Sequence, residues 1–417
     1  MKVTFLCTND CLGGAAIVTH RLMDALRAEG VDARMVVARK SGTSPWVAQV
    51  PRGRFMRAFL SERLEILLRS GLRRRNLWKV DTMRFGCGVT RHPWVREADT
   101  VVLTWVNQGL MSLKDIERLH RMGKRIVWVM HDMWCATGIC HHAEECCRYE
   151  ATCCGCPLLK GGSGSTNTDL STRVQTAKQT LYGRVPIRFV AVSRWLADVC
   201  ARSSLMGTRS VEVIHNAIPL QRYSTVPRLS REQLGLPADG ALIVMAAARL
   251  DDPIKDLPLA IDTLNNLNDR RLPQRPVAVM CGALKNPDAL ATLRLPYVHL
   301  GTVTDPERMA EIYAHSTAVL STSVRETLPG TLIEGMAAGA TPVTTGIGGQ
   351  ADIVDSGTDG YILPPDTPAE AKAAQLALLL EKAITAPFPR EAQRAAVERR
   401  FSSSAVTARF LSLLQDK

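Results

Sequence analysis

The sequence predicts an α/β protein made of two Rossmann-like, doubly wound domains, and three observations lead to this fold class. Short apolar runs alternate with segments of helical periodicity along most of the chain, as expected when parallel strands are buried on both faces. A strand, a glycine-containing loop and a helix follow one another from Val3, and the strand–helix pattern begins again at Ala241. The 417 residues suffice for two domains with separate cores.

Composition narrows the class of protein further. Hydrophobic residues make up 46% of the chain and charged residues 22%, which is ordinary for a soluble globular protein. Since no run reaches about 20 apolar residues, we expect no membrane-spanning helix. The first apolar run is interrupted by Asn9 and Asp10, so it predicts a strand rather than a signal peptide. Together these observations predict a cytoplasmic protein.

In the first domain, candidate binding residues follow the predicted strands. Gly13 and Gly14 come after the first strand and let a backbone approach a phosphate or sugar, with a simple tight turn as the alternative. Asn107 and His131 each follow a later strand. Doubly wound sheets bind their ligands at the carboxyl ends of the strands, so these positions are candidate site residues.

A continuous motif in the second domain lies between Ser323 and Gly349. A buried strand leads into a polar loop, and Pro329 then opens a helix, whose N-terminus suits a phosphate. Two carboxylates eight residues apart, Glu326 and Glu334, are acceptors for sugar hydroxyls. The motif predicts a nucleotide-sugar site, with two surface glutamates beside an ordinary helix as the alternative. The residues expected to bind are Glu326, Thr327, Leu328, Pro329, Gly330, Thr331 and Glu334.

Two cations stand at the end of the first strand of the second domain. Arg249 ends that strand and Lys255 follows six residues later, before a helix. A guanidinium fork and an ammonium point charge together grip a diphosphate, whereas surface charges without a role are the alternative. Gly282 follows the next strand, and we expect it to face the nucleotide.

Glu326 and Glu334 stand in the E-x7-E pattern, and the surrounding sequence resembles retaining glycosyltransferases of the GT-B fold, family 4. The resemblance covers nearly the whole chain and implies two Rossmann-like domains that face each other across a cleft. It divides the chain into an acceptor-side domain at 1–215, a nucleotide-sugar domain at 216–395 and a C-terminal helix at 396–417 that crosses back to the first domain.

The resemblance also implies roles for the candidate residues. His131 would contact the donor sugar near the anomeric centre, Arg249 and Lys255 would neutralise the diphosphate, and Glu326 would act in the reaction. The implied donor is a UDP- or GDP-sugar, and no catalytic metal is required. Relatives usually have glycine after the lysine, whereas Asp256 stands here, so the local backbone shape departs from the family pattern.

Seven of the twelve cysteines lie in a Cys-rich insertion at 135–157. This stretch resembles an insertion in colanic-acid-type exopolysaccharide transferases. Four cysteines with one C-x2-C pair suit a structural zinc ion, for which His141 or His142 could substitute a ligand. Free or disulfide-linked thiols and an iron–sulfur cluster are the alternatives. The candidate metal ligands are Cys140, Cys146, Cys153 and Cys156.

The segment 52–79 carries nine basic residues against two glutamates, which is +7 of the net charge of +12. Within it, a helical pattern separates an apolar stripe from a charged one. Such a segment suits an anionic membrane surface, with an ordinary solvated helix as the alternative. The apolar stripe is Met56, Leu60, Leu64 and Leu67.

The function expected from these observations is transfer of a hexose from a nucleotide-sugar to a glycan acceptor, carried on polyprenyl diphosphate at the inner face of the cytoplasmic membrane. The product would belong to an exopolysaccharide, O-antigen or capsule. A GT-B-like nucleotide-sugar epimerase or hydrolase is the alternative enzyme. A basic, cysteine-rich nucleic-acid-binding protein is a more remote alternative, and we expect no nucleic-acid partner.

The Gly/Ser/Thr-rich segment Gly161–Thr168 predicts a mobile loop.

Overall fold

The computed structural model describes residues 1–159 and 169–415, so the loop predicted at Gly161–Thr168 lies outside the described residues. The chain forms two compact units. Unit 1 comprises Met1–Ala217 and Thr407–Lys417, and unit 2 comprises Ile218–Val406. The first division therefore falls two residues after the predicted boundary at 215/216.

Unit 1 is built on a seven-stranded sheet in the order β3-β2-β1-β4-β5-β6-β7. All its neighbouring strands are parallel, and the central strands are apolar on both faces, as the continuous hydrophobic runs predict. The strands are β1 Lys2–Asn9, β2 Asp32–Arg39, β3 Val47–Gln49, β4 Thr100–Leu103, β5 Arg125–Met130, β6 Ile187–Ala191 and β7 Val211–Val213.

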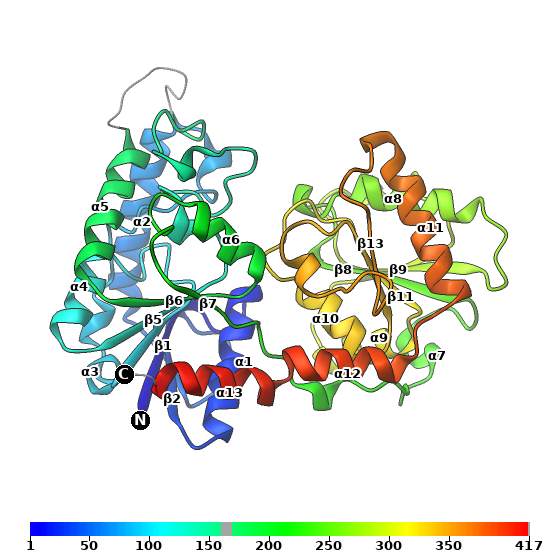
Figure 1. Cartoon of the computed structure of the whole chain (residues 1–417), viewed down its shortest axis with the longest axis horizontal. Helices are drawn as coiled ribbons and strands as arrows, with labels where there is room; N and C mark the ends of the chain where they lie inside the picture. Colours follow the sequence, from blue (N-terminus) through cyan, green and yellow to red (C-terminus); the bar gives the residue numbers. More distant parts are fainter. Residues whose placement is uncertain (160–168, 416–417) are drawn as a thin grey trace. The chain divides into compact units, whose positions relative to one another are not determined.

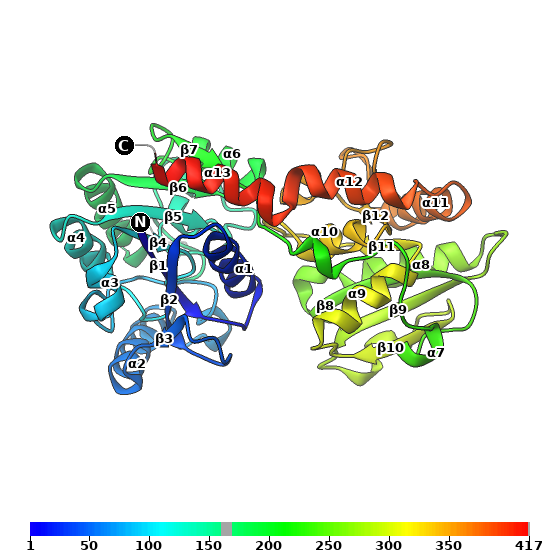
Figure 2. The same cartoon turned by 90° about the horizontal axis from the view of Figure 1, so that it is seen from below.

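Helices cover both faces of this sheet (Figures 1 and 2). Their ends follow local sequence signals: Ser193 caps α6 by accepting from Leu196 N–H at 3.2 Å, and Ser112 with Asp115 forms a capping box on α4. The helices are α1 Gly14–Ala28, α2 Arg52–Arg69, α3 Pro93–Glu97, α4 Leu113–Arg121, α5 Leu170–Arg184 and α6 Arg194–Arg202.

The C-terminal helix α13, Ser403–Gln415, ends within unit 1. The Phe410 ring stacks on Phe5 of β1 with centroids 6.4 Å apart. Arg125 donates a hydrogen bond to the Leu414 carbonyl at 2.8 Å, and Arg188 bonds the Leu413 carbonyl at 2.5 Å. These cations satisfy carbonyls at the negative end of the helix dipole and so fix the last turn of α13.

Unit 2 is built on a six-stranded parallel sheet in the order β10-β9-β8-β11-β12-β13. Its strands are β8 Ala241–Arg249, β9 Pro276–Ala283, β10 Tyr297–Gly301, β11 Ala318–Ser321, β12 Thr341–Thr344 and β13 Tyr361–Ile362. Its helices are α7 Arg231–Leu234, α8 Leu257–Asn268, α9 Pro306–His315, α10 Gly330–Ala337, α11 Lys372–Thr385 and α12 Arg390–Phe401.

Each sheet has one point where the strand order reverses, between β1 and β4 in unit 1 and between β8 and β11 in unit 2. At such a switch point the connections leave toward opposite faces, and the gap between them is where open α/β sheets bind ligands. Gly13 and Asn107 follow β1 and β4, while Arg249 ends β8 and Glu326 follows β11. The topology therefore brings the sequence motifs to the switch point of each sheet.

Helix α2 packs differently from its apparent two-sided pattern. The predicted apolar stripe is not the face that covers the sheet, since Leu60 and Leu64 are exposed. The buried side chains of α2 are Phe55, Ala58, Phe59, Glu62, Arg63 and Ile66. Two charged residues thus point inward while leucines point outward.

Within residues 1–159 and 169–415, no helix is long and apolar enough to cross a membrane.

Candidate active site

An ion pair occupies the switch point of unit 2. Lys255 Nζ lies 2.5 Å from Glu326 Oε1, with 27% and 15% of the two side chains exposed. Lys255 ends a short 3-10 turn after β8, and Glu326 lies in the loop between β11 and α10. The structure thus joins two predicted catalytic residues 71 positions apart, and solvent still reaches both.

The backbone that carries Lys255 depends on Asp256, the residue that departs from the family pattern. Asp256 adopts the left-handed conformation, with φ 49° and ψ 56°, which glycine takes at less cost. Its side chain offsets part of that cost by accepting from Leu259 N–H at 3.4 Å, as a cap on α8. Thr322 Oγ1 donates to the Lys255 carbonyl at 2.8 Å, so this turn is tied to the end of β11.

The loop before α10 is fixed by a close backbone approach. Gly349 N–H donates to the Glu326 carbonyl at 2.9 Å. Gly348 has φ +67°, and a Cβ there would overlap the Glu326 carbonyl oxygen, so this position requires glycine. The glycine loop after β12 therefore holds the backbone of Glu326 in place.

The N-terminus of α10 lies just beyond Glu326. Pro329 is its N-cap residue and supplies no side-chain hydrogen bond, so the first N–H groups of the helix are without a side-chain cap. Leu328 and Pro329 are buried, whereas Thr327, Gly330 and Thr331 are half-buried. Glu334 is half-buried one turn into the helix. Helix α10 thus has an uncapped N-terminus at the place where the motif predicts anion binding.

Arg249 is engaged by carboxylates of its own loop. Its Nη2 lies 2.9 Å from Asp252 Oδ2, its Nε lies 3.3 Å from Asp251 Oδ1, and 41% of the side chain is exposed. The guanidinium is therefore near the switch point but held to one side. A ligand diphosphate would have to compete with these two carboxylates for it.

Gly282 is required by packing. It is buried with φ +149°, and a Cβ would overlap the Ala247 carbonyl on the neighbouring strand. Its own carbonyl lies 2.8 Å from His299 Nε2. The predicted contact with a nucleotide stays a prediction.

After β4 and β5 of unit 1, two buried nitrogens have no hydrogen-bond partner among the described residues: Asn107 Nδ2 and His131 Nε2. Burial lowers the pKa of His131 to about 4, so its imidazole is neutral at pH 7. Buried polar atoms are almost always paired, and orphans of this kind indicate a place for a ligand or water. Both residues were predicted as site residues from their positions after strands.

Gly13 and Gly14 are exposed, Gly13 at the end of the turn after β1 and Gly14 as the first residue of α1. Gly13 is the N-cap of α1 with φ 91°, and α1 has no side-chain cap. No heavy atom would meet a Cβ at either glycine within 4 Å. The first N–H groups of α1 are therefore without a side-chain cap, and neither glycine is packed against another group.

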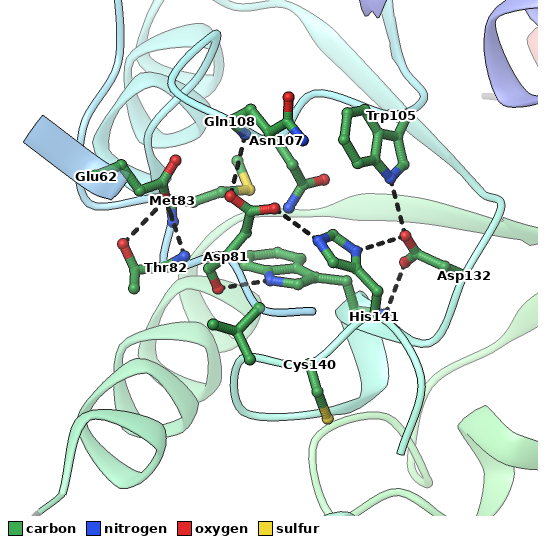
Figure 3. Close-up of polar contacts among 12 residues, drawn as sticks. Glu62, Asp81, Thr82, Met83, Trp105, Asn107, Gln108, Asp132, Cys140 and His141 are labelled. Atoms are coloured by element: carbon green, nitrogen blue, oxygen red, sulfur yellow. Dashed lines mark hydrogen bonds and ion pairs between the residues drawn. The ribbon is translucent and has the colours of Figure 1, made fainter. Parts of the chain in front are cut away.

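Asp132, the residue after His131, belongs to a charged network that sequence reasoning missed (Figure 3). His141 stands between two carboxylates, with Nδ1 2.7 Å from Asp132 Oδ2 and Nε2 2.6 Å from Asp81 Oδ2. Trp105 Nε1 also donates to Asp132 at 3.0 Å, and Trp134 Nε1 donates to the Asp81 carbonyl at 2.8 Å. The network links the Cys-rich insertion to the loops after β4 and β5.

The pKa shifts show that this network is ionised. Burial alone would lower the pKa of His141, but the charges and hydrogen bonds of Asp132 and Asp81 outweigh it and raise the pKa to about 10. Burial alone would raise the pKa of Asp132, but His141 and the Trp134 N–H lower it to about 2. An imidazolium thus bridges two carboxylates inside unit 1.

Helix α2 extends the network with its two inward charges. Arg63 pairs with Asp81, and Glu62 accepts from Thr82 N–H at 2.9 Å and Met83 N–H at 2.8 Å. Burial and then the charge of Asp81 raise the pKa of Glu62 to about 7. The only sequence signal for this network was the pair of adjacent charges at Glu62 and Arg63 in α2. In the sequence analysis these two residues were counted as part of a basic surface segment.

The cysteines of the insertion form no metal centre among the described residues, where no group of three or more His, Cys, Asp or Glu side chains could hold a metal ion. All twelve cysteines are free thiols in this structure, so the disulfide-linked alternative gains no support either. His141 is not a spare ligand, because both its ring nitrogens bond carboxylates. Burial raises the pKa of Cys140 to about 12 and of Cys156 to about 11. The zinc prediction for Cys140, Cys146, Cys153 and Cys156 gains no support from this arrangement.

Two all-parallel sheets with motifs at both switch points define the GT-B class of glycosyltransferase fold, and the comparisons with known proteins agree. Residues 241–382, within unit 2, match the family of glycosyl transferases group 1. The predicted fold class is confirmed.

Three known proteins illustrate the similarity. The putative colanic acid biosynthesis glycosyl transferase WcaC of Escherichia coli K12 is 26% identical over 155 residues, which cover 34% of this chain and 38% of WcaC. Sucrose-phosphate synthase of Thermosynechococcus elongatus has a TM-score of 0.66 at 16% identity, covering 100% of this chain and 98% of that one. HepE of Anabaena, solved with UDP and glucose, has a TM-score of 0.61 at 16% identity, with 99% of both chains covered.

Proposed function

We propose that the protein is a retaining glycosyltransferase that moves a hexose from a nucleotide-sugar to a glycan acceptor in exopolysaccharide, O-antigen or capsule synthesis. The observation that carries the proposal is the partly exposed Lys255–Glu326 pair beside the uncapped end of α10, within the segment that matches glycosyl transferases group 1. The relative WcaC, assigned to colanic acid biosynthesis, and the complex of HepE with UDP and glucose support the same assignment.

In this proposal unit 2 binds the donor, a UDP- or GDP-sugar. The α10 N–H groups and Lys255 neutralise the diphosphate, while Glu326 and Glu334 accept hydrogen bonds from hydroxyls of the ribose or sugar. Arg249 joins the diphosphate by exchanging its contacts with Asp251 and Asp252. These preorganised charges stabilise the leaving group, so the chemistry requires no catalytic metal.

The reaction itself exchanges one bond to the anomeric carbon for another on the same face of the sugar. The bond from that carbon to the diphosphate oxygen breaks, and the acceptor hydroxyl oxygen bonds to the carbon. The acceptor proton passes to the departing diphosphate oxygen. His131 is neutral at pH 7, and its unpartnered nitrogen suits a hydrogen bond to a sugar hydroxyl near the anomeric centre.

We further propose that unit 1 binds the acceptor and that this acceptor is carried on polyprenyl diphosphate. The protein would then work at the inner face of the cytoplasmic membrane, reached through the basic segment 52–79. The +7 charge of this segment favours anionic lipid over a neutral surface.

The experiment has two parts. Thermal unfolding is measured with UDP-, GDP- and ADP-sugars, since a ligand at about 100 times its Kd stabilises by about 2.7 kcal/mol. Products are then analysed with and without cytoplasmic-membrane extract as the source of acceptor. Sugar on a lipid-extractable glycan supports the proposal. An altered nucleotide-sugar or free sugar formed equally fast without acceptor would instead identify an epimerase or hydrolase.

A further inference from the structure

The outward face of α2 carries a ridge of leucines. Leu60 and Leu64 are each 57% exposed and Leu68 is 60% exposed, and Leu72, just past the helix end, is 65% exposed. Leaving leucines in water forgoes the free energy of burying them, so a regular row of exposed leucines indicates a surface that another apolar phase covers. We call Leu60, Leu64, Leu68 and Leu72 the leucine ridge.

A basic pocket of about 520 Å³ opens beside the ridge, between α2 and α4. At 100° per residue, Arg57 shares the helix face of Leu60, Leu64 and Leu68, so the ridge leads to the rim of the pocket. Figure 2 shows α2 at the edge of unit 1. Six cations line this basic pocket: Arg54, Arg57, Arg84, Arg91, Lys114 and Arg118.

The carboxylate that lines the pocket does not neutralise its six cations. Its one carboxylate, Asp115, already accepts from Ser112 and pairs with Arg118 at 3.2 Å. Arg84 pairs with Glu65. Arg54, Arg57, Arg91 and Lys114 form no ion pair with a carboxylate of the described residues. Holding these cations together is unfavourable unless an anion enters, and guanidinium groups are suited to phosphate.

We propose that the basic pocket binds the phosphate of an anionic phospholipid while the leucine ridge inserts into the same bilayer leaflet. The two features require each other in this arrangement, because a headgroup in the pocket carries its acyl chains along the ridge. A soluble phosphate would leave the ridge uncovered. Nucleic acid would too, since its bases stack on aromatic rings rather than on leucines.

This inference names the lipid-contact residues within the membrane part of the proposed function and does not depend on sugar transfer. It is tested by vesicle binding without donor or acceptor, so its failure would leave the transfer proposal standing. Sedimentation is measured with phosphatidylcholine vesicles and with vesicles containing one third phosphatidylglycerol. Separate arms add inorganic phosphate as competitor or replace vesicles by single-stranded RNA.

Three triple variants make the test specific. Arg54→Gln/Arg57→Gln/Arg91→Gln empties the pocket of charge, and Leu60→Gln/Leu64→Gln/Leu68→Gln removes the ridge. The control Arg271→Gln/Arg275→Gln/Arg399→Gln removes the same charge from exposed positions of unit 2. Because each cation at an anionic surface strengthens binding about fivefold, the pocket variant should bind on the order of a hundredfold more weakly. The ridge variant should lose roughly tenfold or more, and the control should bind like the wild type.

Equal losses in the pocket variant and its control would overturn the proposal, since binding would then follow net charge alone. No preference of the wild type for phosphatidylglycerol would overturn it as well. So would RNA binding that the pocket variant abolishes while vesicle binding stays unchanged, or full displacement from vesicles by millimolar inorganic phosphate.

Discussion

The two units hold charge differently near the carboxyl ends of their strands. In unit 1 the imidazolium of His141 is sealed between Asp81 and Asp132, and its charges are paired inside the protein. In unit 2 the Lys255 side chain of the Lys255–Glu326 pair is 27% exposed, and Arg249 is 41% exposed. A sealed network fixes the loops around His131, whereas an open one leaves cations that a ligand can recruit. In the proposed function the first network positions residues and the second binds the donor.

The largest effect is expected at the open site. Glu326→Ala should reduce sugar transfer on the order of 10²–10³-fold, because a group that acts on the transition state is removed. The melting temperature should change little, since the side chain lies in a loop and not in a core. The exposed Glu232→Gln serves as control and should keep full activity. Unchanged transfer by Glu326→Ala would remove this residue from the reaction.

The sealed site should respond in stability. His141→Ala leaves two buried carboxylates without their cation, which typically costs about 3–5 kcal/mol. Urea unfolding followed by circular dichroism measures the loss. The matched control is Glu150→Gln, which breaks the surface pair with Arg202 and should cost about 1 kcal/mol or less. Similar losses in both variants would show that the network is not sealed.

The stabilisation that His141 gives to unit 1 should depend on pH. The folded-state pKa of His141, about 10, lies above its ordinary value of 6.5. The stabilisation is therefore fully present below pH 6.5 and is lost as the pH rises toward 10. The difference in unfolding free energy between wild type and His141→Gln should shrink from pH 6 to pH 9.5. A difference that stays constant would contradict an imidazolium at this position.

The smallest effect concerns Asp256. Asp256→Gly relieves the left-handed backbone but loses the α8 cap, so we expect a net stabilisation of about 0.5 kcal/mol. Asp256→Ala loses the cap and keeps the strain, and should destabilise by about 1–2 kcal/mol. Thermal unfolding of both variants decides the matter. A Gly variant less stable than the Ala variant would be inconsistent with the observed φ of 49°.

The open site was predictable from the sequence because its parts are local. Glu326, Pro329 and Glu334 form one continuous motif, and Lys255 follows its strand at short range. The switch-point topology also follows from the alternation of strands and helices. The sealed site was not predictable, because its contacts join residues that are distant in the sequence. Asp81 bonds His141 across 60 residues, and Glu62 of α2 accepts a hydrogen bond from Thr82. Hydrophobic periodicity predicted helix α2 but not which of its faces is buried. Glu62 and Arg63 lie on the buried face because they bond to partners that are distant in the sequence.

The central claim is that the open cations of unit 2 bind the donor diphosphate, and calorimetric titration with UDP and GDP tests it most directly. Lys255→Met should weaken binding of the preferred nucleotide about tenfold or more. Arg249→Lys keeps the positive charge but loses the planar guanidinium, so it should also weaken nucleotide binding. His141→Gln should bind the nucleotide like the wild type. Wild-type affinity in both Lys255→Met and Arg249→Lys would contradict the account.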